Sequence, residues 1–430
     1  MPADTPPSPA IAIRPVINAT QDDRDLAGYE DRLARPTDVK AAELQDGGRL
    51  RHVIFSRQFT VDLLADLAAS ADRVRRLSRT RGGQDFLRGL LAHKRAMLYF
   101  TQPSTRTFLS FMAACQVLGM TCNEVRDPST SSETKGETRF DSIRMFSSYF
   151  DLIIMRSPIA RLAESCAYLM NDLAATGQRS VPIVNAGSGA DEHPTQALLD
   201  IYTLQRTFKF EGPGKFEGPG SADATRLDRL RRAPGGEGLQ PGLAGKTYAF
   251  CGDIGRGRTV RSLAMLLANY PGVRLVFVAP DHPTLRMGAD LRTRLADAGV
   301  PVLEVESLEQ LVDLPSGSGP VIEQVDALYM TRVQKEHDSP EAAKSYAGIE
   351  FSRYCLTPDL VARMRQHAPI LHPFPRDQHF GEIPAEIDRD PRAMYFRQAR
   401  NGMWARAALL ASLLGVDGEI ADYFARAQDH

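Results

Sequence analysis

The sequence predicts an α/β protein with two domains, each built on a parallel sheet flanked by helices. Short apolar segments typical of buried strands alternate along the chain with segments whose apolar residues recur at helical spacing. That alternation indicates parallel sheets, because two parallel strands need a crossover connection, usually a helix, between them. The chain has 430 residues, which is enough for about two or three domains of ordinary size.

The elements can be placed in order along the chain. Residues 1–50 are rich in Pro, Asp, Arg and Ala with little periodicity, so we expect a partly disordered N-terminal extension. A first helix is expected at about 59–77, where apolar residues recur at helical spacing. Strands are expected at 95–100, 151–156, 181–185, 246–252, 273–279, 325–330 and 368–371. Helices are expected between most of them and after the last, at 106–118, 194–207, 259–269, 357–366 and about 401–416.

One segment interrupts this alternation. Residues 208–242 contain a tandem KFEGPG and many glycines, which is too polar and too Gly/Pro-rich for a core element. We expect a long surface insertion there. Its arginines could contact an acidic partner, or they could belong to a solvated, disordered loop. Arginine-rich segments of this kind more often belong to such a loop.

The composition excludes several classes of protein. Apolar residues make up 43% of the chain, charged residues 24%, and the net charge is −1, which gives no reason to expect a nucleic acid or a membrane as partner. No apolar run reaches the roughly 18 residues of a spanning helix. The N-terminus lacks the basic segment and apolar core of a secretory signal, and its acidic residues argue against a transit peptide. We therefore expect a cytoplasmic protein.

The cysteines point to neither a disulfide framework nor a zinc site. They are five in number, are scattered, and show no Cys-x-x-Cys spacing: Cys115, Cys122, Cys166, Cys251 and Cys355. Free thiols in a reducing compartment fit this pattern better.

Polar and cationic residues gather just after the predicted strands. In an open α/β sheet, ligands bind outside the carboxyl ends of the strands. The residues found there are Ser104, Thr105, Arg106, Thr107, Arg156, His193, Gln196, Arg258, Arg332, Gln334, Pro373 and Arg376, with Ser131 and Lys135 in a loop between elements. So many cationic side chains at strand ends indicate a cleft that binds a polyanion or two anionic substrates.

The segment Ser104-Thr105-Arg106-Thr107 has a physical interpretation of its own. The apolar face that follows it predicts a helix beginning near Thr105, whose first amides have no partner within the helix. A phosphate group is a ligand that such a helix N-terminus binds well. The hydroxyls of Ser104, Thr105 and Thr107 and the guanidinium of Arg106 would add hydrogen-bond donors. Alternatively, Ser104 or Thr105 is only an N-cap.

Two other strand-end motifs are less specific when taken alone. His193 precedes a proline in the first turn of a helix and is either an ordinary loop histidine or a donor to a carbonyl oxygen. The segment GDIGRGRT follows a strand, but its glycine order is not the dinucleotide fingerprint, so a nicotinamide cofactor is not favoured.

Taken together, these motifs resemble the aspartate/ornithine carbamoyltransferase family. STRT and HPTQ mark the family, and TRVQKE and HPxPR point to its aspartate branch. The match covers about residues 50–425, without the N-terminal extension and the insertion. It implies a carbamoyl-phosphate-binding domain (51–192 plus 400–430), an aspartate-binding domain (193–399) and a C-terminal helix packed back on the first domain.

The resemblance also implies a reaction and the residues that perform it. The carbamoyl group of carbamoyl phosphate would pass to the amine of L-aspartate, in pyrimidine biosynthesis, without metal or organic cofactor. The phosphate would be bound by Ser104, Thr105, Arg106 and Thr107. The carbamoyl group would be held by Thr107, Arg156, His193, Gln196 and backbone carbonyls near Pro373 and Phe374. Ser131 and Lys135 would come from a neighbouring subunit of a homotrimer, possibly part of a larger assembly. Aspartate would be bound by Lys135, Arg258, Arg332 and Gln334, and the catalytic residues would be Arg106, Thr107, Lys135, Arg156 and His193.

The chain departs from the family pattern at four positions. Gln102 and His337 replace a Glu and an Arg that bridge the two domains in the family, and Phe108 and Phe374 replace an Arg and a Leu. Domain closure would then be weaker or held by other contacts. Two alternatives remain open, a carbamoyltransferase with another amine acceptor and a weakly active paralogue that acts as a scaffold.

Overall fold

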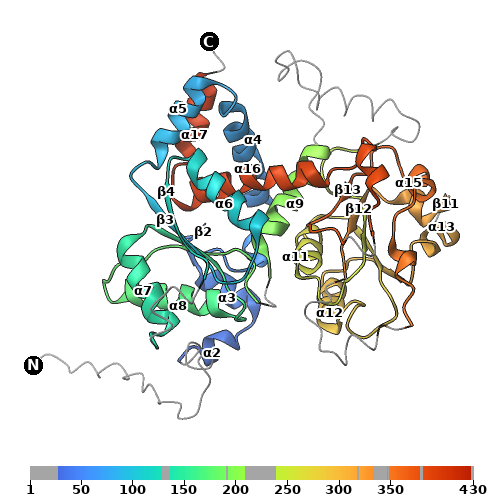
Figure 1. The fold of residues 1–430 in the computed structure, drawn as a ribbon, viewed down its shortest axis with the longest axis horizontal. Helices are drawn as coiled ribbons and strands as arrows, with labels where there is room; N and C mark the ends of the chain where they lie inside the picture. Colours follow the sequence, from blue (N-terminus) through green and yellow to red (C-terminus); the bar gives the residue numbers. More distant parts are fainter. Residues whose placement is uncertain are drawn as a thin grey trace, which may run out of the picture.

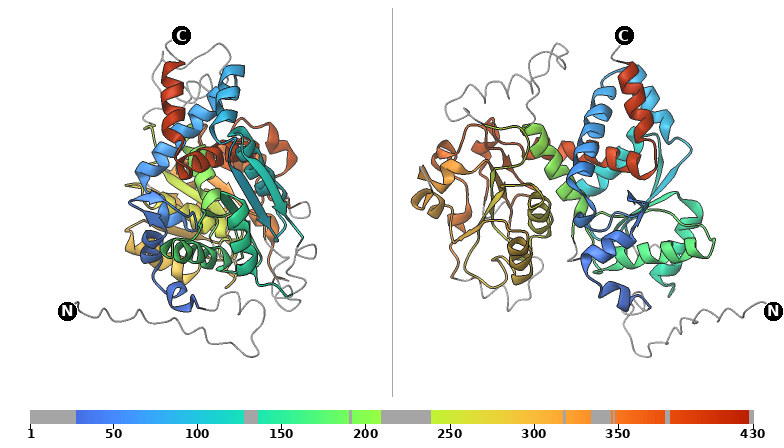
Figure 2. Two further views of the ribbon diagram at one scale, coloured as in Figure 1. Left: turned by 90° about the vertical axis from the view of Figure 1, so that its left-hand side faces the viewer. Right: turned by 180° about the vertical axis from the view of Figure 1, so that it is seen from behind.

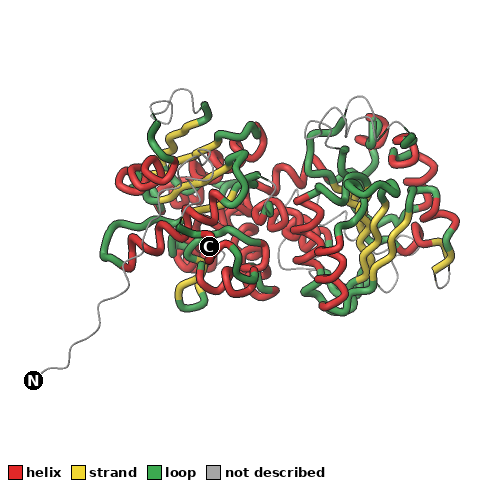
Figure 3. The backbone as a smooth tube through the Cα atoms, turned by 90° about the horizontal axis from the view of Figure 1, so that it is seen from below, coloured by secondary structure: helices red, strands yellow, loops and turns green. Residues whose placement is uncertain are grey.

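Two α/β domains lie side by side in the computed structural model (Figure 1). The structure describes residues 28–427 apart from 128–135, 190–191, 209–238, 317–318, 334–345, 347 and 378–380. Most of the predicted insertion at 208–242 therefore lies outside the described residues. Figure 3 shows most of the strands gathered in the two larger sheets, with helices around each.

The first sheet is four-stranded and parallel throughout. Its order is β4 (Thr121–Val125), β3 (Arg95–Phe100), β5 (Leu152–Arg156) and β6 (Ile183–Asn185). Every residue of β5 and β6 is buried, as expected of strands covered by helices on both faces. Val53 adds an isolated parallel bridge to Val184, beside the outer strand.

The second sheet is five-stranded and also parallel. Its order is β13 (Ile370–Leu371), β12 (Ala327–Met330), β7 (Thr247–Cys251), β8 (Arg274–Val278) and β9 (Val302–Val305). The crossover connections put β7 and β12 at the centre, where they are fully buried. The prediction of two parallel sheets flanked by helices is confirmed.

Helices cover both sheets, and several of them begin at a threonine that caps the first turn. Thr60, Thr80 and Thr138 each accept a hydrogen bond from the backbone three residues on. The helices of the first half are α4 (Val61–Leu77), α5 (Arg81–Leu90), α6 (Thr105–Val117), α7 (Arg139–Tyr149), α8 (Leu162–Ala175) and α9 (Pro194–Thr207). Those of the second half are α11 (Arg258–Leu267), α12 (Ala289–Asp297), α13 (Gln310–Asp313) and α15 (Pro358–Arg363).

The helix α16 (Tyr395–Leu413) connects the two halves of the molecule. It begins beside β13 and then packs on α4, α6 and α9. Small residues such as Gly402, Ala405 and Ala408 form its buried face and allow this close packing. The last helix, α17 (Asp417–Arg426), lies beside α4 and α5 (Figure 2). The predicted return of the C-terminal helix onto the first domain is confirmed.

Residues 28–50 are folded against the first sheet's helices. They form α2 (Glu30–Leu33), α3 (Thr37–Glu43) and a hairpin of β1 (Gln45–Asp46) and β2 (Arg49–Leu50). The Lys40 ammonium lies 2.8 Å from a carboxylate oxygen of Glu164 on α8, and both side chains are buried. Arg32 pairs with Asp172 at the far end of the same helix. This segment covers the outer face of α8, so that helix is buried nearly all round.

Two strands of the parallel sheets, β4 and β9, were not expected from the sequence, nor were the short antiparallel pairs β1–β2 and β10 (Pro315–Ser316)–β11 (Gly319–Pro320). Both β4 and β9 lie at sheet edges and keep several exposed or half-exposed residues, such as Glu124 and Glu304. These two strands lack the continuous apolar run of a buried strand, and that run is the signal used to place the others.

Candidate active site

A cavity of about 500 Å³ opens between the two halves of the molecule, at the carboxyl ends of strands from both sheets. Among the residues that the structure describes, none that lines it is a carboxylate. Five arginines do line it: Arg106, Arg156, Arg258, Arg332 and Arg406. A concave site with this charge attracts anions, and the expected cleft for two anionic substrates matches it.

The turn from β3 into α6 forms one wall of the cavity. Residues 102–107 line it, and α6 begins at Thr105, as the apolar pattern indicated. Ser104 occupies the N-cap position, but its hydroxyl makes no capping hydrogen bond. That hydroxyl and the free amides of the first turn are therefore available to an anion, which argues against a cap as the only role of Ser104.

Arg156 and His193 form the adjoining wall. Arg156 ends β5, and its Nη1 donates to the carbonyl oxygen of Ala186 at 3.1 Å. Its Nε is buried without a hydrogen-bond partner among the described residues, as is Nδ1 of His193. Burial lowers the pKa of Arg156 to about 9, with the Arg258 charge acting in the same direction. Burial and the nearby Arg156 charge hold the pKa of His193 well below its usual value, so its imidazole is neutral at physiological pH.

A glycine permits the close approach of these two side chains to the backbone. Gly187 has a φ of +97°, and a Cβ there would lie 2.6 Å from Cδ2 of His193 and 2.8 Å from Nη1 of Arg156. Any larger residue at position 187 would displace both groups.

The second half of the molecule contributes Arg258 and Arg332. Arg258 opens α11 directly after the glycine-rich turn, and its guanidinium donates to the carbonyl oxygen of Gly189, across the cavity from its own sheet. Arg332 follows β12, where the Thr331 hydroxyl accepts from the amide of Asp253 at 3.0 Å and ties the two turns together. Both arginines line the cavity.

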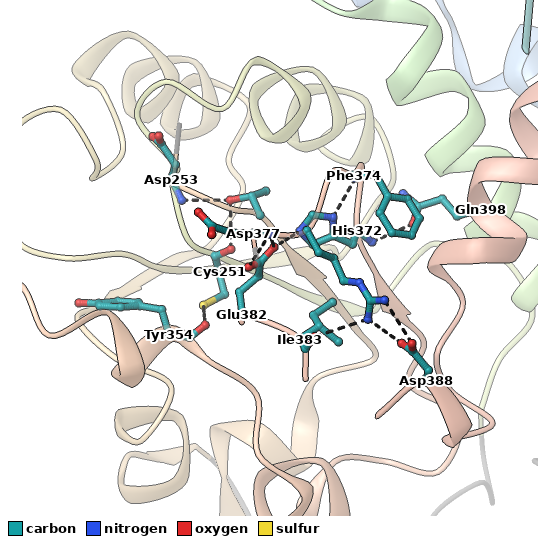
Figure 4. Close-up of polar contacts among 12 residues, drawn as sticks. Cys251, Asp253, Tyr354, His372, Phe374, Asp377, Glu382, Ile383, Asp388 and Gln398 are labelled. Carbon is teal, nitrogen blue, oxygen red and sulfur yellow. Dashed lines mark hydrogen bonds and ion pairs between the residues drawn. The ribbon is translucent and has the colours of Figure 1, made fainter. Parts of the chain in front are cut away.

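The segment His372–Pro375 closes the cavity from the same half, and the Phe374–Pro375 peptide bond is cis. The His372 ring lies 2.9 Å from a Glu382 carboxylate oxygen and accepts from the Phe374 amide at 2.8 Å (Figure 4). The Phe374 ring faces the Arg106 guanidinium, whose Cζ is 5.5 Å from the ring centroid. Arg376 instead pairs with Asp388 at 2.6 Å and does not line the cavity.

The cavity thus brings together most of the residues that the sequence singled out. Those that line it are Ser104, Thr105, Arg106, Thr107, Arg156, His193, Gln196, Arg258, Arg332, Pro373 and Phe374. Ser131, Lys135 and Gln334 lie outside the described residues, and so does His337. Gln102 also lines the cavity, with a buried Oε1 that has no partner among the described residues. Phe108 is a core residue packed on Phe100, so its replacement of an arginine affects the core.

Gln398 and Arg406 also line the cavity, and the sequence pattern did not single them out. Both belong to α16, which follows no strand end and reaches the cavity only by packing back across the molecule. Arg406 donates to the Ser110 hydroxyl at 2.7 Å, and burial lowers its pKa to about 10. A single arginine within the apolar run MWARAALLASLL was the available signal, since an unpaired cation is rarely buried.

Comparison with known proteins decides the family. A model of the aspartate/ornithine carbamoyltransferase carbamoyl-P binding domain matches residues 51–206, and a model of the Asp/Orn binding domain matches residues 244–413. The chain belongs to the aspartate/ornithine carbamoyltransferase family. The resemblance noted in the sequence is confirmed.

Individual carbamoyltransferases cover nearly the whole chain. The chloroplastic aspartate carbamoyltransferase of Arabidopsis thaliana is 34% identical over 385 residues, 88% of this chain and 80% of that protein. The aspartate carbamoyltransferase catalytic subunit of Alkaliphilus oremlandii is 36% identical over 317 residues, 74% of this chain and 78% of that protein. The structure of Trypanosoma cruzi aspartate transcarbamoylase with carbamoyl phosphate and aspartate aligns with a TM-score of 0.66 and 29% identity, covering 87% of this chain and 98% of that one.

The comparisons correct one expectation. The prediction of a cytoplasmic protein is wrong, because the similar carbamoyltransferases of Arabidopsis thaliana, Pisum sativum and Oryza sativa are chloroplastic. Composition and the lack of a secretory signal do not separate the cytosol from an organelle interior, since both are aqueous compartments. Within the described part of the chain, no helix is long and apolar enough to cross a membrane.

Proposed function

We propose that this protein transfers the carbamoyl group of carbamoyl phosphate to the amine of L-aspartate, which yields N-carbamoyl-L-aspartate and phosphate for pyrimidine biosynthesis. The observation that carries the proposal is the cavity between the two matched domains, lined by five arginines and by no described carboxylate. Carbamoyl phosphate and aspartate are both anions, and a cavity of this charge suits the pair.

The first domain holds the phosphate and activates the carbamoyl group. Ser104, Thr105 and Thr107 donate to phosphate oxygens together with the first amides of α6, and Arg106 adds its planar fork. The carbamoyl oxygen is bound by Thr107, Arg156 and neutral His193. These donors are already in place before the reaction, so they stabilise the negative charge that develops on that oxygen.

The second domain presents the amine. Arg258 and Arg332, together with Gln334 and the Lys135 ammonium, bind the two carboxylates of aspartate and direct its amine at the carbamoyl carbon. The amine forms a C–N bond, the carbonyl oxygen takes the negative charge, and collapse of the tetrahedral intermediate breaks the bond to phosphate. The departing phosphate takes the amine proton.

Assembly follows from the same proposal. Ser131 and Lys135 act in the site of a neighbouring subunit, so that complete sites form only in a homotrimer, alone or within a larger assembly. Within each chain, residues 51–192 and 400–430 form the carbamoyl-phosphate domain and residues 193–399 the aspartate domain, and residues 1–50 are an extension. The two family models also divide the chain into a first unit, residues 51–206, and a second unit, residues 244–413, which supports a two-domain division.

A direct assay tests the function. Purified protein is given carbamoyl phosphate with a panel of amines: L-aspartate, L-ornithine, L-glutamate and L-asparagine. We expect carbamoyl product from L-aspartate and little from the others. Only the two carboxylates of aspartate, with the separation they have in that molecule, engage both Arg258 and Arg332. Product from another amine alone would establish a different acceptor, and no product from any amine would indicate a scaffold.

A further inference from the structure

A carboxylate lies buried directly behind the cavity. Asp200 is on α9, one turn after Gln196, and has no exposed surface. It does not line the cavity, and the function proposed above gives it no role. A fully buried carboxylate is costly unless several groups donate to it, so its partners indicate why the position is acidic.

Three donors converge on Asp200 from three elements. The Oδ1 atom accepts from Nε2 of Gln196 at 3.0 Å and from Nε2 of Gln398 on α16 at 2.6 Å. The Oδ2 atom accepts from the hydroxyl of Tyr329 on β12 at 2.9 Å. Because an ionised carboxylate only accepts hydrogen bonds, both glutamine amides must turn their nitrogen toward it.

Because the nitrogens of Gln196 and Gln398 are bound to Asp200, each glutamine presents its side-chain oxygen to another partner. Gln196 lines the cavity, and with Nε2 bound to Asp200 its Oε1 is the atom left for a ligand. The Oε1 of Gln398 accepts from the amide of His372 at 2.8 Å, at the start of the segment that carries Pro373 and Phe374 (Figure 4). Asp200 thus fixes the Gln196 oxygen as an acceptor on one wall of the cavity. Through Gln398 it also fixes the position of the His372–Phe374 backbone on the other wall.

We propose that Asp200 is a positioning residue for recognition of the carbamoyl group. It holds Gln196 so that the side-chain oxygen accepts from the carbamoyl NH2, and through Gln398 it holds His372–Phe374 so that backbone carbonyls face the same NH2. Asp200 acts on the groups that face the NH2 group, and Asp200→Asn leaves the phosphate donors on α6 and the Phe374 side chain beside Arg106 unchanged, so we expect phosphate binding not to depend on it. The inference rests on the function proposed above.

The same arrangement makes recognition of the NH2 group dependent on pH. Burial raises the pKa of Asp200 to about 7, while the bonds from Gln398, Tyr329 and Gln196 and the charge of Arg406 act in the opposite direction. The ionisable groups acting on it are Tyr329 from β12 and Arg406 from α16. A protonated carboxyl is a weaker acceptor than a carboxylate, so the hold on both amides weakens as pH falls through about 7.

The test compares two ligands that differ in the NH2 group. Phosphonoacetamide keeps the amide and the phosphoryl group of carbamoyl phosphate but cannot transfer its acyl group, and inorganic phosphate has no NH2. Their dissociation constants are measured by calorimetry on the full-length wild type and on Asp200→Asn, at about pH 8 and about pH 5.5. Asn keeps one carbonyl oxygen for the two amides without the charge.

We expect Asp200→Asn to bind phosphonoacetamide about 3- to 10-fold more weakly than the wild type at the higher pH, because a charge-assisted bond becomes a neutral one. At the lower pH the wild-type carboxyl is protonated, and the two proteins should bind it equally. Phosphate affinity should be unchanged by the substitution at both values. In a Gln196→Ala background the effect of Asp200→Asn should shrink to less than about 2-fold, since the main link to the ligand is gone.

Asp72→Asn is the matched control. Asp72 accepts at 2.8 Å from Tyr202, two residues after Asp200 on α9, and does not line the cavity, so its loss should leave both affinities unchanged. Equal phosphonoacetamide affinity of wild type and Asp200→Asn at the higher pH would overturn the inference. So would an equal loss of phosphate affinity, which would make Asp200 a general support of the site. A wild type that binds phosphate but not phosphonoacetamide would overturn the proposed function as well.

Discussion

Individual side chains in the cavity are tuned by burial and by one another. Arg156 keeps one guanidinium nitrogen on the Ala186 carbonyl and leaves its Nε without a partner among the described residues. His193 is held neutral by burial and by the Arg156 charge beside it. A neutral imidazole can donate to an oxyanion without losing its proton to it, so this pair suits the stabilisation of developing charge.

Replacement of Arg156 by Lys tests that role. Lys keeps the positive charge but loses the fork that spans the Ala186 carbonyl and the substrate oxygen. We expect kcat to fall about 100-fold, the usual cost of one lost oxyanion donor, with a much smaller change in KM for carbamoyl phosphate. Steady-state kinetics measure both, and a loss in kcat below about 3-fold would remove Arg156 from the mechanism.

Phe374 is a second residue whose side chain has a measurable consequence. Its ring lies against the Arg106 guanidinium, which belongs to the other wall of the cavity. The substitution Phe374→Leu removes a cation–π contact of about 0.5–2 kcal/mol, so we expect phosphate to bind about 2- to 30-fold more weakly. Phe396→Leu is the control, because Phe396 packs on Phe374 and is 54% exposed, without a contact to Arg106. An equal effect of both substitutions would contradict the assignment.

At the scale of elements, a buried ion pair between Lys40 and Glu164 ties the folded segment 28–50 to α8. The side chains of Lys40 and Glu164 are 8% and 5% exposed, whereas those of Arg57 and Asp38, also an ion pair, are 45% and 69% exposed. Charges that leave water need their partner, so the two pairs should respond very differently to truncation.

We expect Lys40→Ala to lower the free energy of unfolding by about 3–5 kcal/mol, because it leaves the Glu164 carboxylate buried without its cation. Arg57→Ala should cost less than about 1 kcal/mol, as exposed pairs do. Denaturant titration of the two variants against the wild type gives both values. If the two losses were the same, α3 would be held by something other than the Lys40–Glu164 pair.

The elements also show which parts of the fold and of the site can be predicted from the sequence. Central strands such as β5 and β7 are predictable because both of their faces are buried. The residues that follow them are predictable as site residues because ligands bind at the carboxyl ends of the strands. Edge strands β4 and β9 lack that apolar run. Asp200, Gln398 and Arg406 could not be placed in advance, since their meeting depends on how α16 crosses the molecule, which is a tertiary property.

At the scale of the whole molecule, the site lies between two domains, and we expect their relative closure to control it. Gln102 lines the cavity, and its Oε1 has no partner among the described residues; the resemblance noted in the sequence implies a glutamate that bridges the domains at this position. Its partner position holds His337 in place of an arginine. The neutral pair offers a bond of about 1 kcal/mol, against about 1.5–3 for a charged one.

The double substitution Gln102→Glu with His337→Arg should therefore strengthen closure. We expect a lower apparent KM for aspartate, by about 2- to 30-fold, because aspartate completes its site only when the domains meet. Aspartate saturation curves at fixed carbamoyl phosphate measure the change, and each single substitution serves as the control, since neither restores a pair. Saturation curves identical to those of the wild type would show that closure does not depend on these positions.

The most direct measurement for the whole account follows the carbamoyl carbon itself. Carbamoyl phosphate labelled with ¹³C at the carbonyl is mixed with L-aspartate and the purified protein, and the label is followed by NMR. We expect the label to appear in N-carbamoyl-L-aspartate while phosphate is released in equal amount. Arg156→Lys should slow the transfer of the label about 100-fold. Phosphate release without label in carbamoyl aspartate, or transfer unaffected by Arg156→Lys, would contradict the account.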